Sequence, residues 1–483
     1  MSGLKKSIGI SFLTQYAELV IQFVGLMILA RIITSEEVGI YSVAAFLMAL
    51  LHVFRDFGVA KYLIQADKLE PATIRSAMGV AYILAWTVAL VLLACSNMLA
   101  NFYHEPQIKS ILAVMSASFA VTPIGSVVGA LFRRNMQVKR LAAVRLGSVI
   151  CHVIVAVILG LLGFGAMSLA WANFANIVSY GLLAAALRGP GVPLMPSFKN
   201  MREILSFGSI SSLGSVANVA GSNSPDVIIG KAISLAATGY FSRGNGLVQM
   251  FKTLVAGAIV PLVLPYFSQL RREQKDMVEP YRLAIAHLTG FAWPFYAVMA
   301  LLALPVVRTL YGNSWDVSVP IVRILCLAGA ISTLSTFAGE VMVAYGHIKV
   351  VTKLHLLNQP VRVLAVLAGS MYGLMEIGYG LVVAECMVFG TTSHYLYKTN
   401  GVRYRVVMSA TVKSAVLTAC SIVVPALVLV TWAADKHEVL QLAVGGSGAL
   451  FGWLAGIVLT GHPIRQHLQQ AQVRFWPAAP WSK

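Results

Sequence analysis

The sequence predicts an all-α integral membrane protein, and three observations lead to this fold class: an apolar composition, a series of long apolar segments and an internal repeat. Hydrophobic residues make up 58% of the 483 residues and charged residues 11%, with a mean hydropathy of +0.78. Soluble domains carry roughly 25% charged residues. A composition this poor in charge is typical of a chain that is buried in lipid.

About fourteen segments are long and apolar enough to cross the membrane as helices, since roughly 20 apolar residues span the hydrocarbon layer. Most of the connectors are short, so we expect no separate soluble catalytic domain. The segments begin near residues 8, 38, 76, 108, 142, 166, 203, 236, 283, 318, 351, 374, 408 and 439.

The repeat relates two stretches that are 200 residues apart. Arg31 to Ser42 aligns with Lys231 to Ser242, basic on basic, glycine on glycine and aromatic on aromatic. A polar stripe precedes each stretch, at spacings that keep its members on one helix face. The two stripes are Ser11, Gln15, Glu18 and Gln22, and Ser211, Ser215, Asn218 and Ser222. This pattern predicts two related halves that face a shared polar space.

A proline- and glycine-rich segment from Arg188 to Pro196 separates the halves. Each half has an even number of spans, so the halves should share one orientation and be related by a pseudo-twofold axis along the membrane normal. We therefore predict a six-helix lobe at 1–187, a cytoplasmic linker at 188–202, a second six-helix lobe at 203–397, and two additional transmembrane helices with a cytoplasmic tail at 398–483.

The basic residues that give the net charge of +18 are distributed unevenly between the two sides of the predicted topology. With the N-terminus inside, 27 of the 36 lysines and arginines fall on the cytoplasmic side, five fall outside and four lie within spans. This bias predicts that both termini are cytoplasmic. We therefore assign the basic charge no nucleic-acid partner. Polar residues interrupt the first apolar segment, so we expect it to remain as a helix rather than to be cleaved as a signal peptide.

The sequence shows none of the catalytic or metal-binding motifs that would indicate an enzyme. The five cysteines fall inside predicted spans without CxxC spacing, so we interpret them as small apolar residues rather than disulfide partners or metal ligands. The sequence has no P-loop, HExxH, DxD or GxSxG motif of the kind that enzymes use. We expect a transporter that is not an enzyme, with no cofactor and no metal.

Charged residues inside spans are the candidates for function, because each costs roughly 2.5 to 3.5 kcal/mol at a helix centre. They are Glu18, Asp226, Arg243, Lys252, Arg323, Glu340, Arg362 and Glu385. Any one of them could equally form an internal salt bridge or extend to the membrane surface. As a set, cations among amides and hydroxyls favour an anionic, hydrogen-bonding substrate.

The repeated stretches resemble a known family. Ala30 to Tyr41, followed by Asp56-Phe-Gly58, is similar to the N-terminal signature of the polysaccharide transporters in the multidrug/oligosaccharidyl-lipid/polysaccharide exporter superfamily. Asp226 to Gly230 and Gly239-Tyr-Phe-Ser242 resemble that family's pattern after the seventh span. The resemblance covers essentially the whole chain and looks nearest the exopolysaccharide and colanic-acid exporters.

This resemblance implies a Wzx-type flippase of the bacterial cytoplasmic (inner) membrane. Such a protein moves undecaprenyl-pyrophosphate-linked oligosaccharide to the periplasmic leaflet by alternating access, for exopolysaccharide, capsule or O-antigen synthesis. The implied partners are the lipid-linked oligosaccharide and membrane lipids, and the resemblance also admits the polysaccharide polymerase and export machinery.

We assign hypothetical roles to the polar residues on this basis. Four bases would contact the pyrophosphate or acidic sugars: Arg243, Lys252, Arg323 and Arg362. Arg31 and Lys231 would lie near the outer mouth. The sugar path would be lined by Gln15, Gln22, Ser215, Asn218 and Gln249. Glu18 would either carry a coupling proton or neutralise an arginine between the lobes.

Two alternatives from the same superfamily stay open, a cation-coupled multidrug exporter and a lipid II flippase. A drug exporter for cations should keep acidic cavity residues, whereas the intramembrane set here has as many bases as acids. A membrane-embedded polymerase or ligase would need a long outer loop with catalytic Arg or His, and the outer connectors here are short.

Overall fold

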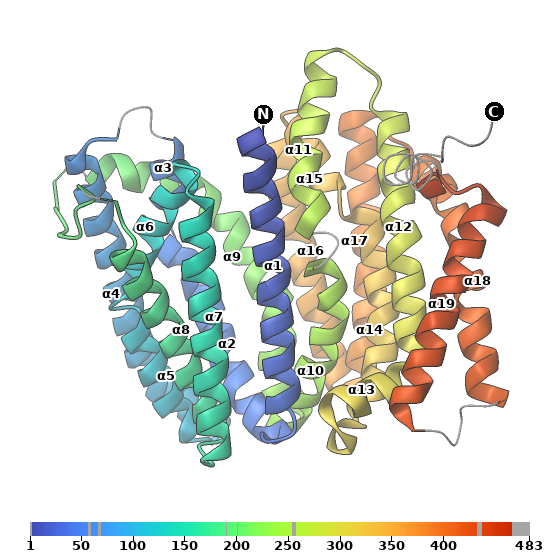
Figure 1. Cartoon of the computed structure of the whole chain (residues 1–483), viewed down its shortest axis with the longest axis horizontal. Coiled ribbons are helices and arrows are strands. Elements are labelled where there is room, and N and C mark those ends of the chain that lie inside the picture. The colour runs from blue at the N-terminus through green and yellow to red at the C-terminus, as the bar shows by residue number, and fades with distance from the viewer. Residues whose placement is uncertain are drawn as a thin grey trace, which may run out of the picture. The chain divides into compact units, whose positions relative to one another are not determined.

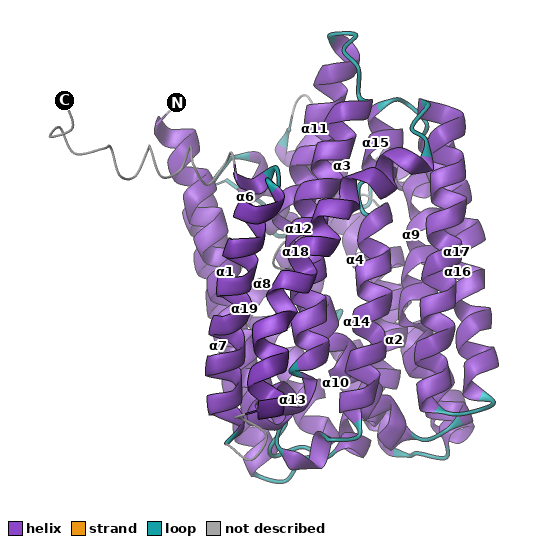
Figure 2. Cartoon of the chain, turned by 90° about the vertical axis from the view of Figure 1, so that its right-hand side faces the viewer, coloured by secondary structure: helices purple, strands orange, loops and turns teal. Residues whose placement is uncertain are grey.

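The computed structural model describes residues 2–56, 59–65, 69–189, 191–199, 201–253, 257–431 and 437–465. Within these ranges all regular secondary structure is helical, as Figure 2 shows. The all-α fold class predicted from composition is therefore confirmed.

The helices follow one another in Figure 1 from blue to red. They are α1 (Ser2–Leu29), α2 (Ser35–Asp56), α3 (Val59–Gln65), α4 (Pro71–Tyr103), α5 (Gln107–Ser118), α6 (Thr122–Arg134), α7 (Val138–Leu161), α8 (Ala166–Ala186), α9 (Met201–Ala232), α10 (Leu235–Phe251), α11 (Gly257–Arg272), α12 (Val278–Leu301), α13 (Ala303–Tyr311), the 3₁₀ turn η2 (Asn313–Trp315), α14 (Ser318–Ser332), the 3₁₀ turn η3 (Thr333–Ser335), α15 (Ala338–Ala344), α16 (Ile348–Ser370), α17 (Leu374–Asn400), α18 (Tyr404–Thr431) and α19 (Glu438–Thr460).

Each predicted span falls on one helix or on two consecutive helices. Among the described residues, ten helices are long and apolar enough to cross a membrane, or eleven if the bent pair α5 and α6 counts as one span. Two of the other predicted spans fall short: α10, which has 17 residues, and α16, whose polar side chains lower its hydropathy. The protein is a multi-pass membrane protein, and the number fourteen stays a prediction.

The chain divides into two compact units, Met1–Ser242 and Arg243–Lys483. The boundary lies inside α10, so α9 and the first turns of α10 belong to the first unit. The lobe boundaries inferred from the proline- and glycine-rich linker stay a prediction.

In the first unit, α7 packs against α1 and α8, while α5 and α6 pack against α8. Helix α9 covers α2 and α4. One buried cluster joins α2, α4, α5 and α8 around side chains such as Leu92, Ile108 and Phe119. Lipid is as apolar as these side chains, so close packing between the helices, rather than removal from water, stabilises this unit.

The segment after α8 lies along the start of α4. The backbone N–H of Ser197 donates to the carbonyl of Arg75 at 2.8 Å. Gly79 allows this approach, because a Cβ atom there would lie 2.2 Å from the Ser197 carbonyl oxygen. The predicted linker is therefore fastened to the first unit by its backbone.

In the second unit, α12 packs against α14 and α18, α16 against α17, and α18 against α19. A glycine stripe on α19 permits the last contact, since a Cβ at Gly452 would lie 2.2 Å from the Cys420 carbonyl oxygen. Small residues at this spacing let membrane helices approach closely. The two C-terminal helices are thus closely packed on α12 through α18.

The segment after α19 is anchored by a buried imidazole. His462 Nε2 lies 3.2 Å from Ser414 Oγ of α18, and the N–H of Ile464 donates to His462 Nδ1 at 3.3 Å. Ser414 Oγ in turn lies 2.9 Å from Thr289 Oγ1 of α12. His462 is 1% exposed. This chain of contacts joins α12, α18 and the end of α19.

The fourth span of each predicted half is interrupted. Helices α5 and α6 meet at a bend of 48° across residues 119–121, and η3 separates α14 from α15. Hydroxyl side chains accompany both breaks and donate to nearby backbone carbonyls, as Thr122 does to Ser118 at 2.8 Å and Thr336 to Ser332 at 3.3 Å. These bonds occupy carbonyls that irregular backbone would leave unpaired in an apolar setting.

Candidate functional site

The repeated stretches cross each other in the first unit, with reciprocal contacts. A Cβ at Gly39 would lie 1.8 Å from the Leu235 carbonyl oxygen, and one at Gly239 would lie 1.8 Å from that of Ser35. The hydroxyls of Ser42 and Ser242 form a 3.1 Å hydrogen bond. Glycine is therefore required at both positions by backbone approach, and equivalent residues of the two stretches meet each other.

The helix starts at this crossing are capped alike. Thr34 Oγ1 accepts from the N–H of Glu37 at 3.3 Å, and the Glu37 carboxylate accepts from the N–H of Thr34 at 2.8 Å. This reciprocal pair is a capping box. At α10, Ser234 Oγ accepts from the N–H of Ala237 at 3.0 Å, without the returning carboxylate.

The buried charge of the first unit is Glu18 on α1, which is 7% exposed. Arg145 Nη2 on α7 donates to Glu18 Oε2 at 2.7 Å, while Oε1 is buried and has no hydrogen-bond partner in the part of the chain that the structure describes. Both residues belong to the first unit, so the arginine that neutralises Glu18 comes from the same unit.

A line of polar groups continues from this ion pair along α7 and α8. Asn176 Nδ2 donates to the Ser148 carbonyl at 3.1 Å, one turn beyond Arg145. Tyr180 packs against Gly125 and Gly129 of α6. A Cβ atom at either glycine would lie 2.7 Å from the Tyr180 side chain. Asn173 Oδ1 is buried, and no described residue forms a hydrogen bond with it. The interior of this unit thus offers carboxylate, guanidinium, amide and phenol groups.

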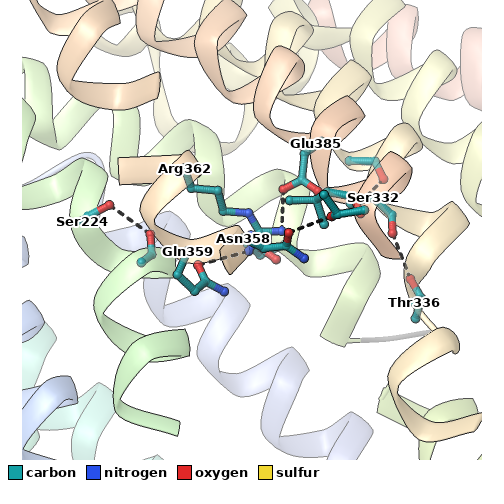
Figure 3. A network of polar contacts seen from close by, with 12 residues as sticks. Ser224, Ser332, Thr336, Asn358, Gln359, Arg362 and Glu385 are labelled. Carbon is teal, nitrogen blue, oxygen red and sulfur yellow. Dashed lines mark hydrogen bonds and ion pairs between the residues drawn. The ribbon is translucent and has the colours of Figure 1, made fainter. Parts of the chain in front are cut away.

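The buried charge of the second unit is an ion pair between α16 and α17. Arg362 Nη2 lies 2.7 Å from Glu385 Oε1, and the two side chains are 20% and 11% exposed. Figure 3 shows Asn358 and Gln359 beside the pair. Lys252, in a π-turn at the end of α10, lies within electrostatic range of both charges. Two basic side chains therefore lie near one carboxylate, and Arg362 forms the ion pair with it.

Amides and hydroxyls complete this cluster. Thr391 Oγ1 on α17 donates to Asn358 Oδ1 at 2.8 Å, and Arg362 Nη1 lies 3.5 Å from Gln359 Oε1. Asn358 and Gln359 are 8% and 4% exposed. Pro360 sits between them and Arg362 and cannot donate to the Leu356 carbonyl, so one backbone acceptor of α16 loses its usual partner.

The other two predicted bases of the set lie elsewhere in the second unit. The Arg243 guanidinium carbon stands 5.8 Å from the ring centre of Trp315, a cation–π contact. Arg323 is exposed and its Nε donates to the Ala300 carbonyl at 3.3 Å, next to the end of α12. Of the four bases, the structure brings Lys252 and Arg362 together.

The remaining predicted residues are spread over both units. Lys231 is exposed, donates to the Phe102 carbonyl and lies 4.4 Å from the Phe102 ring centre. Gln249 Nε2 lies 3.4 Å from Asn245 Oδ1 on α10. Arg31, Gln22 and Asn218 are exposed and Gln15 is half-buried. The side chain of Ser215 lies outside the described residues, as do Phe57 and Gly58 of the signature.

Sequence reasoning missed three features of these clusters. It counted Arg145 with the cytoplasmic connectors, although this residue lies about two turns into α7. It did not pair Arg362 with Glu385, because the two residues are on different helices and no periodicity relates them. It did not find the breaks in the fourth spans. Their serines and threonines, at 116–122 and 332–336, were the available signal.

Comparison with known proteins gives a consistent picture. The sequence profile of a family described as "Polysaccharide biosynthesis protein" matches residues 28–320. The succinoglycan biosynthesis transport protein ExoT of Rhizobium meliloti (strain 1021) is 26% identical over 335 residues, 69% of this chain and 67% of that protein. The lipopolysaccharide biosynthesis protein WzxC of Escherichia coli (strain K12) is 20% identical over 374 residues, 75% and 74% of the two chains.

Among solved structures, the lipid II flippase MurJ in an inward closed conformation aligns with a TM-score of 0.72 at 11% identity, covering 92% of this chain and 97% of that one. This similarity shows a shared fold. Because the family profile covers more than half of the chain, the protein belongs to the polysaccharide biosynthesis protein family that its repeated stretches resemble.

Proposed function

We propose that this protein is a flippase that moves undecaprenyl-pyrophosphate-linked oligosaccharide from the cytoplasmic to the periplasmic leaflet of the bacterial inner membrane. Membership of a polysaccharide biosynthesis family supports this proposal, as do relatives named for transport in succinoglycan biosynthesis and for lipopolysaccharide biosynthesis. The process is transport by alternating access of the two predicted six-helix lobes, with no bond made or broken. Both termini are cytoplasmic in this proposal.

The cluster of Lys252, Arg362 and Glu385 is the observation that carries the proposal. It carries one excess positive charge and is surrounded by the amides of Asn358 and Gln359. A diphosphate supplies the missing negative charge and several acceptor oxygens, which suit a guanidinium. We assign the diphosphate to this cluster.

The sugars are assigned to the amide and hydroxyl groups of Gln15, Gln22, Ser215, Asn218 and Gln249. Amides both donate and accept hydrogen bonds, as sugar hydroxyls do. Arg31 and Lys231 remain our candidates for the outer mouth, and Arg243 and Arg323 for acidic sugars. Glu18 is our candidate for ion coupling, with Arg145 as the group that it releases on taking up a proton.

The decisive experiment compares polyprenyl-linked lipids extracted from cells with and without the protein, by mass spectrometry. The expected result of its loss is accumulation of a complete lipid-linked oligosaccharide, reversed by the wild-type gene. Accumulation of lipid II instead would assign the protein to that alternative. Unchanged lipids together with altered sensitivity to cationic drugs would assign it to drug export.

The same assay tests the site. Replacing Lys252 and Arg362 by glutamine should reproduce the accumulation, whereas Lys275→Gln, in the exposed connector between α11 and α12, should leave the lipids unchanged. Full activity after alanine replacement of Arg243, Lys252, Arg323 and Arg362 together would overturn the diphosphate assignment.

A further inference from the structure

The ion pair of the second unit leaves much of its arginine unused. A guanidinium has five N–H donors. Arg362 makes one short contact, from Nη2 to Glu385 Oε1 at 2.7 Å, and a weaker one from Nη1 to Gln359 at 3.5 Å. Its Nε atom is buried and has no hydrogen-bond partner among the described residues. The site therefore holds at least one guanidinium donor, Nε, that is buried and not used by the ion pair.

A second arginine of the same unit provides an internal comparison. Arg308 binds Asp316 through two nitrogens, Nε at 3.0 Å and Nη2 at 2.8 Å, and its Nη1 reaches Glu438 at 3.5 Å. Two-nitrogen binding is the common, geometrically matched form of an arginine–carboxylate pair. All three nitrogens of the Arg308 guanidinium thus contact carboxylates. Arg362 contacts its carboxylate through one nitrogen and one oxygen.

The charges around Arg362 also fail to balance. Lys252 interacts electrostatically with Glu385 and with Arg362, and within the described residues its ammonium makes no hydrogen bond or ion pair. Gln359 and Asn358 are uncharged. One carboxylate therefore lies near two basic side chains. A ligand with more negative charge and more acceptor oxygens would bind these side chains more strongly than the carboxylate does.

We propose that Glu385 is a positioning residue whose carboxylate occupies Arg362 in the empty protein and is displaced by the diphosphate of the substrate. This inference rests on the proposed function. The carboxylate keeps the buried guanidinium paired and oriented between transport cycles. It also competes with the bound diphosphate, which lowers affinity and allows release at the other side of the membrane.

Binding of farnesyl diphosphate to the purified full-length protein in lipid nanodiscs tests the proposal. Glu385→Gln keeps the shape of the side chain and removes its charge, so it should tighten binding by about tenfold, equivalent to 1.4 kcal/mol. Glu385→Asp retains the competing charge and should bind within about threefold of wild type. Glu376→Gln, an exposed carboxylate in the first turn of the same helix, is the matched control and should bind as wild type does.

Thermal unfolding with and without farnesyl diphosphate distinguishes displacement of Glu385 by the ligand from a purely structural ion pair. Without ligand, Glu385→Gln should unfold at a lower temperature than wild type, because Arg362 is left unpaired. With ligand, its midpoint should rise by more than that of wild type. An equal or smaller rise would overturn the proposal.

The variant Arg362→Gln distinguishes failure of the proposed Glu385 displacement from failure of the diphosphate assignment. If Arg362→Gln weakens binding and Glu385→Gln does not strengthen it, the displacement of Glu385 is wrong and the diphosphate site stands. If wild type and Glu385→Gln both fail to bind, or if Arg362→Gln binds as well as wild type, the diphosphate assignment itself fails and the displacement fails with it.

Discussion

Arg145 illustrates what a single residue contributes and why sequence alone misplaced it. A count of basic residues places it with the cytoplasmic connectors, since it follows Arg133, Arg134, Lys139 and Arg140 closely. The backbone of α7 begins at Val138, however, and carries Arg145 to a point 2.7 Å from the buried Glu18. Charge patterns give topology, but the partner of a buried charge depends on packing between helices.

Loss of Arg145 should cost more than loss of the whole pair. Arg145→Gln leaves the Glu18 carboxylate enclosed and uncompensated, whereas Glu18→Gln with Arg145→Gln removes both charges. Because Arg145 is 44% exposed, we expect a loss of about 1–2 kcal/mol for the single variant, between the values for exposed and buried pairs. Thermal unfolding in detergent measures the difference, and equal losses in the single and double variants would contradict it.

His462 should make stability depend on pH. Burial, with His287 and Lys413 nearby, lowers the pKa of His462 to about 4, so the folded protein keeps this imidazole neutral. The unfolded chain binds the proton with an ordinary pKa near 6.5. The stabilising contribution is therefore complete above about pH 6.5 and is lost as the pH falls towards 4.

The measurement is the unfolding midpoint of the wild type and of His462→Gln between pH 7 and pH 4. The wild type should lose several degrees more than the variant, because glutamine has no proton to gain. Parallel curves for the two proteins would show that other groups cause the acid sensitivity.

Among the helices, the long apolar ones could be predicted, and the interrupted ones could not. Periodicity and length located the ten described helices that are long and apolar enough to cross a membrane, because burial in lipid imposes the same requirement on each. The breaks at 119–121 and at η3 escape this reasoning, since a serine or threonine in a continuous membrane helix also bonds back to the preceding turn. Gly39 and Gly239 could be aligned with each other but not predicted to face a carbonyl.

Alanine at Gly39 or Gly239 should therefore be costly. Either Cβ would lie 1.8 Å from a backbone oxygen of the facing helix start, which cannot move aside as a side chain can. We expect a loss of about 1–3 kcal/mol, as for overpacked cores. Gly246→Ala is the control, since Gly246 lies on α10 as Gly239 does and its Cβ would meet nothing within 4 Å. This variant should be neutral or stabilising.

The double variant Ser42→Cys, Ser242→Cys should form a cross-link between α2 and α10. The two hydroxyls lie 3.1 Å apart, so thiols in their place are close enough to oxidise to a disulfide. The reaction can be followed in a background that lacks the five native cysteines, by a shift in electrophoretic mobility with and without reductant. Combining Ser42→Cys with Asn218→Cys, at an exposed position of α9, provides the negative control.

At the scale of the whole molecule, composition was sufficient to predict a multi-pass helical protein, and the positive-inside bias predicts its orientation. Labelling with a membrane-impermeant maleimide tests that orientation. Gln274→Cys, between α11 and α12, should react only from the cytoplasmic side, and Asn313→Cys, in η2, only from the periplasmic side. Both positions are exposed. The opposite labelling pattern would invert the proposed topology.

The division into two six-helix halves stays a prediction. A linker rich in proline and glycine marks where the chain changes direction and does not determine where the packing of one unit ends. The sequence places a boundary at 188–202, whereas the first compact unit continues to Ser242. The difference comes from α9, whose contacts with α2 and α4 cannot be read from its own residues.

The packing of α9 has a consequence for synthesis. As the chain leaves the ribosome, α2 and α4 enter the membrane long before α9 does, and the faces that α9 later covers are open to lipid or to insertion factors until residues 188–232 have been made. The first unit therefore cannot finish assembling one helix at a time. A chain that ends near residue 187 would therefore leave the faces of α2 and α4 that α9 covers without their partner helix.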